Sequence, residues 1–287
     1  MTDILLTFDG IAALAQAAKD RPVINAAWNG MIDSALWGGS RCAGSAWHGT
    51  DSFDNAFDRA TQGSPEDRAT IATTLEAAQV ATVTVAAPTL MYDVAGYRPH
   101  VARAIAGEPC CMIRRGADHN VTRPVFRLLV NFGASNDITG QRRVNRGAAI
   151  AAAVDAIEAA GTRVEIEAVM RAISSSGEKH SHETRIMLKQ ASDPMDIDAL
   201  AFALVNPAVH RRFVFSLREG ASFFWESYGS PQDVIPESGQ VYLPLMTAHE
   251  GQWETPTRAA QYVQGFLESA SQFAIDGLAQ PVHNVRA

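Results

Sequence analysis

A seven-residue apolar stretch followed by a long alanine-rich segment constrains the fold of this chain more than any other feature. Residues 125–131 (VFRLLVN) have the length and composition of a buried strand. Residues 137–160 follow as a helix that Gly161 ends, and residues 163–169 (RVEIEAV) form a second strand after a short turn. A strand, a helix and a strand in this order are the repeating unit of a parallel sheet, so we expect an α/β fold.

The rest of the second half continues this alternation. We expect strands over 182–190, 211–217 and 240–246, and helices over 196–206 and 255–274. The fold class is then a doubly wound, mostly parallel sheet with helices on both faces. Ligands in such sheets bind at the carboxyl ends of the strands, so the loop after Asn131 is the first place to look for a site.

The first part of the chain has helical signals of its own. Helices are predicted over 10–20, 53–62 and 65–79, with a strand over 80–87 and a loop rich in glycine, serine and tryptophan over 25–50. We therefore divide the chain into two parts. Residues 1–121 form a mainly helical N-terminal region, and residues 122–287 form the α/β domain.

Composition narrows the class of protein further. Of the 287 residues 47% are hydrophobic and 19% are charged, which is enough apolar material for a packed core. The net charge of −7 argues against a nucleic-acid-binding protein. Three cysteines are too few for a disulfide framework, and we see no signal peptide and no apolar run long enough to cross a membrane. We expect a cytoplasmic protein.

Several segments of the second half resemble a von Willebrand factor A-type domain, over about residues 122–280. The similarity lies in the strand RLLVN, the turn NFGASND, a helix that ends in EAAG, the strand TRVEIEAV, and the segment DIDALAFALVNPAVHRRFVFSLREG. The whole chain is similar to uncharacterised phage-associated proteins that carry such a core. The resemblance implies a protein partner, such as an AAA+ ATPase or a virion component, and a location in the host cytoplasm or the virion.

Active domains of that family bind a divalent ion through an Asp-x-Ser-x-Ser loop after the first strand. In this chain Asn131 takes the place of the Asp and Gly133 that of the first Ser, and only Ser135 fits. Asp137 is a possible substitute carboxylate, and the loop after the fourth predicted strand offers Glu219 beside an arginine. Hard cations prefer carboxylate oxygens, so we expect a degenerate ion site without a cofactor, with Mg²⁺ binding as the alternative.

Two histidines one residue apart offer a second metal hypothesis. His180 and His182 lie at the start of a predicted strand, where residues i and i+2 share a face and both can reach one zinc ion. No third ligand is identifiable. The alternative interpretation is a polar strand start without a ligand role, and we assign no metal ligands.

Arginines are concentrated in the middle of the chain. Nine arginines and three acids lie between Arg98 and Arg146, a balance of +6 in an acidic protein. Arg142, Arg143 and Arg146 fall on the helix after the first strand of the domain, near the expected ligand-binding edge. They are candidates for binding an anion, unless they are solvated or paired within the chain. No glycine-rich phosphate loop accompanies them.

An aromatic group follows the fourth predicted strand. Phe223, Phe224, Trp225 and Tyr228 either form a surface for a partner or hold their segment against the sheet. The first hypothesis is therefore a non-enzymatic protein–protein interaction module, in which these four residues contact the partner. The alternative is an enzyme that acts on a phosphorylated or nucleotide substrate at the carboxyl edge of the sheet. The sequence assigns no catalytic residue.

Overall fold

The computed structural model of the chain describes residues 3–21, 40–41, 47–78, 90–95, 98–115, 125–135, 138–159, 162–174, 180–220, 228–247 and 249–275. The predicted strand over 80–87 and most of the predicted loop over 25–50 lie outside these residues. Among the described helices, none combines the length and the apolar character that a membrane span requires.

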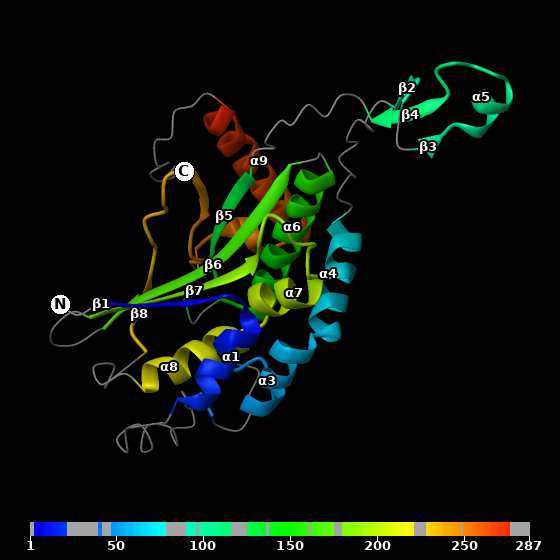
Figure 1. The fold of residues 1–287 in the computed structure, drawn as a ribbon. Helices are drawn as coiled ribbons and strands as arrows, with labels where there is room; N and C mark the ends of the chain where they lie inside the picture. Colours follow the sequence, from blue (N-terminus) through cyan, green and yellow to red (C-terminus); the bar gives the residue numbers. More distant parts are fainter. Residues whose placement is uncertain are drawn as a thin grey trace.

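A mostly parallel sheet forms the centre of the molecule (Figure 1). Its strands lie in the order β1 (Asp3–Phe8), β7 (Ser181–Lys189), β6 (Arg163–Ile173), β5 (Val125–Asn131) and β9 (Gln240–Leu243). The pairs β1/β7, β6/β5 and β5/β9 are parallel, whereas β7 and the short β8 (Ser230–Gln232) are antiparallel to β6. The predicted α/β class with a mostly parallel sheet is confirmed.

Most predicted helices form, and local sequence explains where they begin. The described helices are α1 (Ile11–Asp20), α3 (Phe53–Gln62), α4 (Pro65–Ala78), α6 (Gly140–Ala159), α7 (Ile197–Val205), α8 (Phe215–Glu219), α9 (Pro256–Ile275), the π-helix η1 (Val209–Val214) and the 3₁₀ turn η2 (Gly251–Trp253). The side chains of Ser52 and Asp196 each accept a hydrogen bond, both at 3.0 Å, from a backbone N–H in the first turn of α3 and α7.

The sheet buries one face and leaves the other polar. Along β6, Val164 and Ile166 pack in the cluster that contains α6 and α9, while Ala168 and Met170 pack in the cluster that contains α1 and η1. These residues alternate along one strand and therefore share one face of the sheet. In the described part of the chain the helices cover this face, so the prediction of helices on both faces is wrong.

The opposite face of the sheet is largely polar, which explains why the described helices do not cover it. It carries ion pairs between neighbouring strands, such as Arg127 with Glu165 at 3.0 Å and Arg185 with Glu167 at 3.3 Å. Alternation of apolar and charged residues is typical of a sheet with one solvated face. Near Leu129 this face packs against Val169, Val234 and Tyr242, where the segment from β8 to β9 covers it.

Both parts of the predicted division contribute to the same sheet. Strand β1 pairs with β7, and α1 packs against η1. A separate three-stranded sheet, of β2 (Leu90–Asp93), β4 (Met112–Arg115) and β3 (Arg98–Pro99), stands with α5 (Val101–Ile105) apart from the main body in Figure 1. The boundary after residue 121 stays a prediction, but the first part is not a purely helical addition to the sheet.

The predicted strand over 211–217 is wrong. These residues belong to η1 and α8, which continue from α7 after a short connection at Asn206 and Pro207. Both helices are buried along their whole length, so neither has a solvent-exposed polar face that would mark it as an amphipathic helix. A short apolar run of this kind cannot be assigned to strand or helix by periodicity.

Candidate anion-binding site

The loop after β5 uses its first side chain for structure. Asn131 is fully buried, and its amide nitrogen donates to the Gln232 carbonyl at 3.0 Å and to the Tyr242 hydroxyl at 2.9 Å. Its amide oxygen accepts from the Gly133 backbone N–H at 2.9 Å. The side chain of Asn131 therefore holds β8 and β9 against the end of β5.

Ser135 and Glu219, which were also predicted for an ion site, have different surroundings. The Ser135 hydroxyl is buried without a hydrogen-bond partner among the described residues, and Asp137 lies outside them. Glu219 lies in α8 and not in a loop after a strand. Its carboxylate accepts hydrogen bonds from the backbone and hydroxyl of Ser40 and from the hydroxyl of Tyr228.

The described residues around this loop do not fit a Mg²⁺ site. The amide oxygen of Asn131 already accepts a hydrogen bond from the Gly133 backbone N–H. Among the described contacts, no carboxylate lies beside this oxygen to act as a second ligand. Within the described ranges no group of three His, Cys, Asp or Glu side chains is arranged to hold a metal.

Arg146 satisfies the backbone at the carboxyl ends of the strands. Its guanidinium donates to the carbonyl oxygens of Asn131 at 2.7 Å, Pro244 at 2.6 Å and Leu243 at 3.4 Å. Burial lowers the pKa of Arg146 to about 10, so it remains charged at neutral pH. Its two terminal nitrogens therefore brace the strand ends, while its Nε atom is buried without a hydrogen-bond partner in the described part of the chain.

Arg142 is also engaged within the protein. It forms an ion pair with Glu254, next to η2, and this pair is partly exposed. Residues i and i+4 of a helix share a side, so Arg142 and Arg146 both face the segment that leads into α9. Two of the three predicted anion-binding arginines are thus paired, as the alternative interpretation of the arginine group expected.

Arg143, like Arg146, has an unused buried donor, but no ion pair or side-chain hydrogen bond is described for it. It is 5% exposed, and its Nη2 atom has no acceptor in the described part of the chain. Burial, with Arg211 and Arg146 as further causes, lowers its pKa to about 9, which still leaves a cation at pH 7. An isolated buried charge is strongly unfavourable unless an opposite charge accompanies it.

The position of Arg143 on α6 is related to the contact between α6 and α7. Gly147, one turn further along α6, lies so close to α7 that a β-carbon there would approach Val205 Cγ2 to 2.6 Å. Arg143 lies on the same side of α6 as Gly147. Val205 is the last residue of α7, and η1 with His210 and Arg211 follows it along the chain.

The π-helix presents two further basic side chains. His210 is 5% exposed, and neither ring nitrogen has a hydrogen-bond partner among the described residues. Burial, and then the charges of Arg143, Arg218 and Arg211, hold its pKa well below its usual value, so the imidazole is neutral. Its ring packs edge-on against Phe215, with centroids 4.7 Å apart.

Among the described residues, the partner of Arg211 is neutral. Its guanidinium donates to the Trp47 carbonyl and lies 4.3 Å from the centre of the Trp47 ring. Burial lowers its pKa to about 10, and it therefore carries a positive charge at pH 7. We call Arg143, His210 and Arg211 the basic cluster.

The charge balance of the described interior is uneven. Its buried cations are Arg143, Arg146, Lys189, Arg211, Arg212 and Arg218, and its buried carboxylates are Asp67 and Glu219. Lys189 pairs with Glu158 at 2.7 Å, and Arg212 binds oxygen atoms of Ser40 and Thr50. No ion pair in the described ranges involves Arg143 or Arg211.

Sequence reasoning missed His210 and Arg211. Arg211 was assigned to the predicted strand over 211–217, and His210 lies directly before it. A strand and a helix give a side chain different neighbours, so the wrong assignment hid both residues. The available signal was three consecutive basic residues, His210 to Arg212, within an apolar segment. π-Helical turns are rare and occur frequently at functional sites, which adds weight to this segment.

The remaining predicted residues do not enlarge the site. Phe223, Phe224 and Trp225 lie outside the described residues. Tyr228 stacks on Phe215 with ring centroids 3.5 Å apart, and this contact holds its segment against α8. His182 is fully buried on β7, where burial and then the charge of Arg218 lower its pKa to about 3.

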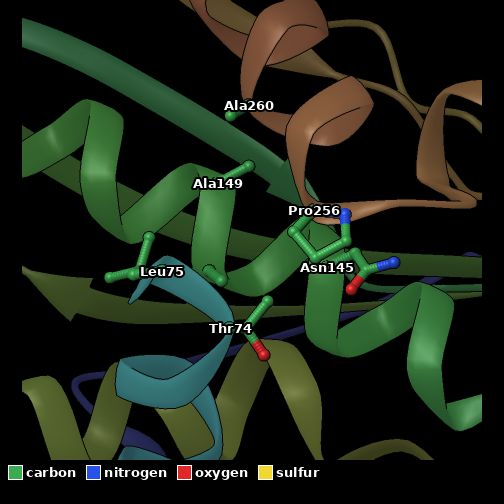
Figure 2. Close-up of a pocket in the computed structure, with 7 residues that line it drawn as sticks. Thr74, Leu75, Asn145, Ala149, Pro256 and Ala260 are labelled. Atoms are coloured by element: carbon green, nitrogen blue, oxygen red, sulfur yellow. The ribbon is translucent and has the colours of Figure 1, made fainter. Parts of the chain in front are cut away.

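A shallow pocket between α4, α6 and α9 is no better candidate (Figure 2). Its lining includes Thr74, Leu75, Pro256 and Asn145. The amide of Asn145 is already used, since it donates to the Trp253 carbonyl at 2.9 Å and accepts from Gln141 at 3.0 Å. No charge lines this pocket, so it gives no reason to expect a ligand.

Comparison with known proteins places the chain in a family. Residues 2–271 match the family model described as Domain of unknown function (DUF7192), so the chain belongs to this family. No curated protein and no solved structure matches the chain.

Proposed function

We propose that this protein binds a small anionic ligand at the carboxyl edge of its sheet, through the basic cluster of Arg143, His210 and Arg211. The observation that carries the proposal is the guanidinium of Arg143, which is buried with an unused donor and without a carboxylate among the described residues. A bound anion would supply the missing charge and accept the unused hydrogen bond.

The position of the cluster supports the same proposal. Arg143 lies in the first turns of α6, which has no acidic residue in its first turn. The amino end of a helix is positive, so basic side chains there raise the free energy of the protein until an anion binds. Open sheets of the α/β class bind ligands at this edge.

Thermal unfolding in the presence of different anions tests the proposal. We expect phosphate or sulfate to raise the Tm of the wild-type protein in a saturable manner. The Arg143→Met variant should lose this shift, while its Tm without ligand should equal or exceed that of the wild type, because a buried unpaired charge has been removed. Arg142→Gln is the matched control and should keep the shift.

Two results would overturn the proposal. One is the absence of any saturable shift with the wild-type protein. The other is an equal shift in the Arg143→Met variant and the wild type, which would place the anion elsewhere.

We also propose that residues 122–287 form a von Willebrand factor A-like domain with an altered ion loop. The support is the succession of β5, α6, β6 and the antiparallel β7, with the loop that begins at Asn131. The cover of helices on one face is a departure from the doubly wound arrangement. An experimental structure compared with members of that family tests the assignment.

The docking hypothesis remains a separate proposal. A phage-encoded interaction module would bind an AAA+ ATPase or a virion component through Phe223, Phe224, Trp225 and Tyr228. Affinity purification followed by mass spectrometry tests it, with Trp225→Ala as the variant expected to lose the partner. Such a module and an anion site are compatible in one protein.

A further inference from the structure

We infer that the outer edge of β1 pairs, antiparallel, with the same edge of a second copy of this chain, so that two sheets join into one. This inference concerns the edge of the sheet and does not depend on the basic cluster. It follows from the unpaired edge, from the exposed apolar side chains of β1 and from the match of the strand with itself.

Strand β1 ends the sheet on one side. Its inner edge pairs in parallel with β7, from Asp3 beside Ser181 to Phe8 beside Ile186, without a shift of register. In the described part of the chain no strand pairs with its outer edge (Figure 1). An edge strand presents a row of unpaired backbone N–H and C=O groups, and such a row can accept a further strand.

The sequence of β1 has none of the features that commonly protect an edge. Proteins block edge strands by lysine, proline, a bulge or a short length. Strand β1 (DILLTF) has six residues without lysine or proline, and its one charged residue, Asp3, is the first. At the other edge of the sheet β9 has four residues, and Pro244 follows it directly. The chain therefore limits pairing at β9 but not at β1.

Both faces of β1 have apolar side chains that another strand would cover. Leu6 and Phe8 pack on the helix-covered face, against the cluster that contains α1 and η1, and both remain partly exposed. Leu5 alternates with them and lies on the polar face, where it is 60% exposed. A strand beside β1 would remove apolar surface from water on both faces, which is favourable.

A second copy fits this edge because β1 matches itself. With a two-fold axis at Leu5, the two Leu5 side chains lie opposite each other, Ile4 lies opposite the partner's Leu6, and Asp3 lies opposite the partner's Thr7. Opposite residues of an antiparallel pair project to the same face. In this register apolar residues therefore meet apolar residues, and the one charged residue meets a hydroxyl.

The neighbouring registers are less favourable. A two-fold axis that keeps both polar faces on one side allows only shifts that move the pairing by two residues. One such shift places Asp3 opposite the partner's Asp9, and like charges directly opposite each other are destabilising. The other places Asp3 opposite the partner's Leu5. A single strand pair covers less surface than a standard protein interface, so we expect a dimer that dissociates on dilution.

Sedimentation velocity of the full chain over a series of concentrations tests the inference. We expect the wild type to show an equilibrium of monomer and dimer. Leu5→Lys places two ammonium groups opposite each other at the axis, which should raise the Kd of the dimer at least about tenfold. The monomer accommodates this lysine, because Leu5 is exposed and Glu183 lies beside it on β7. Circular dichroism checks the fold.

The matched control is Ile105→Lys. Ile105 lies in α5 and is 82% exposed, so this variant also replaces an exposed apolar residue by lysine. It should leave the Kd unchanged.

Two substitutions of Thr7 test the register. Thr7→Lys places a positive charge, and Thr7→Asp a negative one, opposite the partner's Asp3, and each contact occurs twice in the dimer. The Kd of Thr7→Asp should exceed that of Thr7→Lys at least about tenfold at low ionic strength, and salt should reduce the difference. Arg185 lies beside position 7 in monomer and dimer alike, so the comparison reports on the partner's Asp3.

Three results would overturn the inference. A wild type that is monomeric at every concentration would leave the edge of β1 to a strand of another protein. A dimer that Leu5→Lys does not weaken, or that Ile105→Lys weakens as strongly, would have its interface elsewhere. Equal Kd values for the two Thr7 variants would exclude the antiparallel register at Leu5.

Discussion

The amide nitrogen of Asn131 donates a hydrogen bond to the hydroxyl of Tyr242 at 2.9 Å and thereby joins the end of β5 to its neighbour β9. The Tyr242 hydroxyl donates in turn to Asp233 at 2.8 Å, so its oxygen is an acceptor toward Asn131. The second acceptor, the Gln232 carbonyl, lies in β8. Three segments at the carboxyl edge are thus held by one side chain that must be a donor.

A carboxylate at this position should destabilise the fold. In the Asn131→Asp variant two acceptors, the Gln232 carbonyl and the Tyr242 hydroxyl, face a group without a hydrogen to donate. We expect the free energy of unfolding to fall by about 1–3 kcal/mol, measured by urea denaturation. Tyr242→Phe, which leaves the Gln232 contact in place, should have a smaller effect, near 1 kcal/mol.

The same variant tests whether the loop can become an ion site. We expect Mg²⁺ to leave the Tm of Asn131→Asp unchanged, because the surrounding oxygens already serve β8 and β9. A Mg²⁺-dependent recovery of stability would contradict this view and show that one carboxylate is enough to restore ion binding.

Arg146 and Arg142 should differ strongly although they lie one turn apart. Arg146→Gln removes donors from the carbonyls of Asn131, Leu243 and Pro244, and we expect a loss of about 2–4 kcal/mol in the free energy of unfolding. Arg142→Gln breaks a partly exposed ion pair with Glu254 and should cost less than about 1 kcal/mol. Equal losses in the two variants would mean that the buried carbonyl contacts contribute little.

Regular segments of this fold were predictable from local sequence. The strand over 125–131 agrees with β5 to the residue, and Ser52 caps α3 as its position before Phe53 implies. In these segments the periodicity of apolar residues and the capping residue point to the same structure. The mostly parallel sheet followed from the order of such segments.

Errors arose where partners lie far along the chain. The segment over 211–217 is apolar on all sides, and its assignment depends on Trp47 and Thr50, which contact Arg211 and Arg212 from more than 160 residues away in sequence. Helices cover one face of the sheet because the other face carries ion pairs between strands, such as Arg185 with Glu167. No local pattern contains this information.

The candidate site was predicted in location but not in composition. The loop after Asn131 and the start of α6 were the expected place, and Arg143 was among the residues named. Arg143 cannot be separated from Arg142 and Arg146 by local pattern, because the contacts with Glu254 and with the strand-end carbonyls distinguish them. His210 and Arg211 come from a helix that had been assigned as a strand.

The close contact between α6 and α7 makes Gly147 essential to the placement of Arg143. In the Gly147→Ala variant the new methyl group meets Val205 Cγ2, which must move or force the helices apart. We expect a loss of about 1–3 kcal/mol despite the better helix propensity of alanine. In a Val205→Ala background the same substitution should become neutral or stabilising by up to about 1 kcal/mol. A loss that persists in this background would show that another neighbour sets the distance between the helices.

Two buried histidines should make the fold sensitive to acid. The folded-state pKa of His182 is about 3 and that of His210 is well below 6.5, whereas both groups take up protons near pH 6.5 in the unfolded chain. As the pH falls below 6.5 the unfolded state therefore binds more protons than the folded state, and stability decreases. Each histidine should lower the free energy of unfolding by up to about 1.4 kcal/mol per pH unit, until the folded-state pKa is reached.

Urea denaturation of matched variants between pH 7.5 and pH 4.5 isolates this effect from that of the carboxylates. His210→Gln should flatten the decline below pH 6.5 relative to the wild type, because one proton-binding difference between the two states is removed. His249→Gln is the control, since His249 is exposed, and it should follow the wild-type curve. Parallel curves for His210→Gln and the wild type would contradict the lowered pKa of His210, because they would mean that the folded and unfolded states take up its proton over the same pH range.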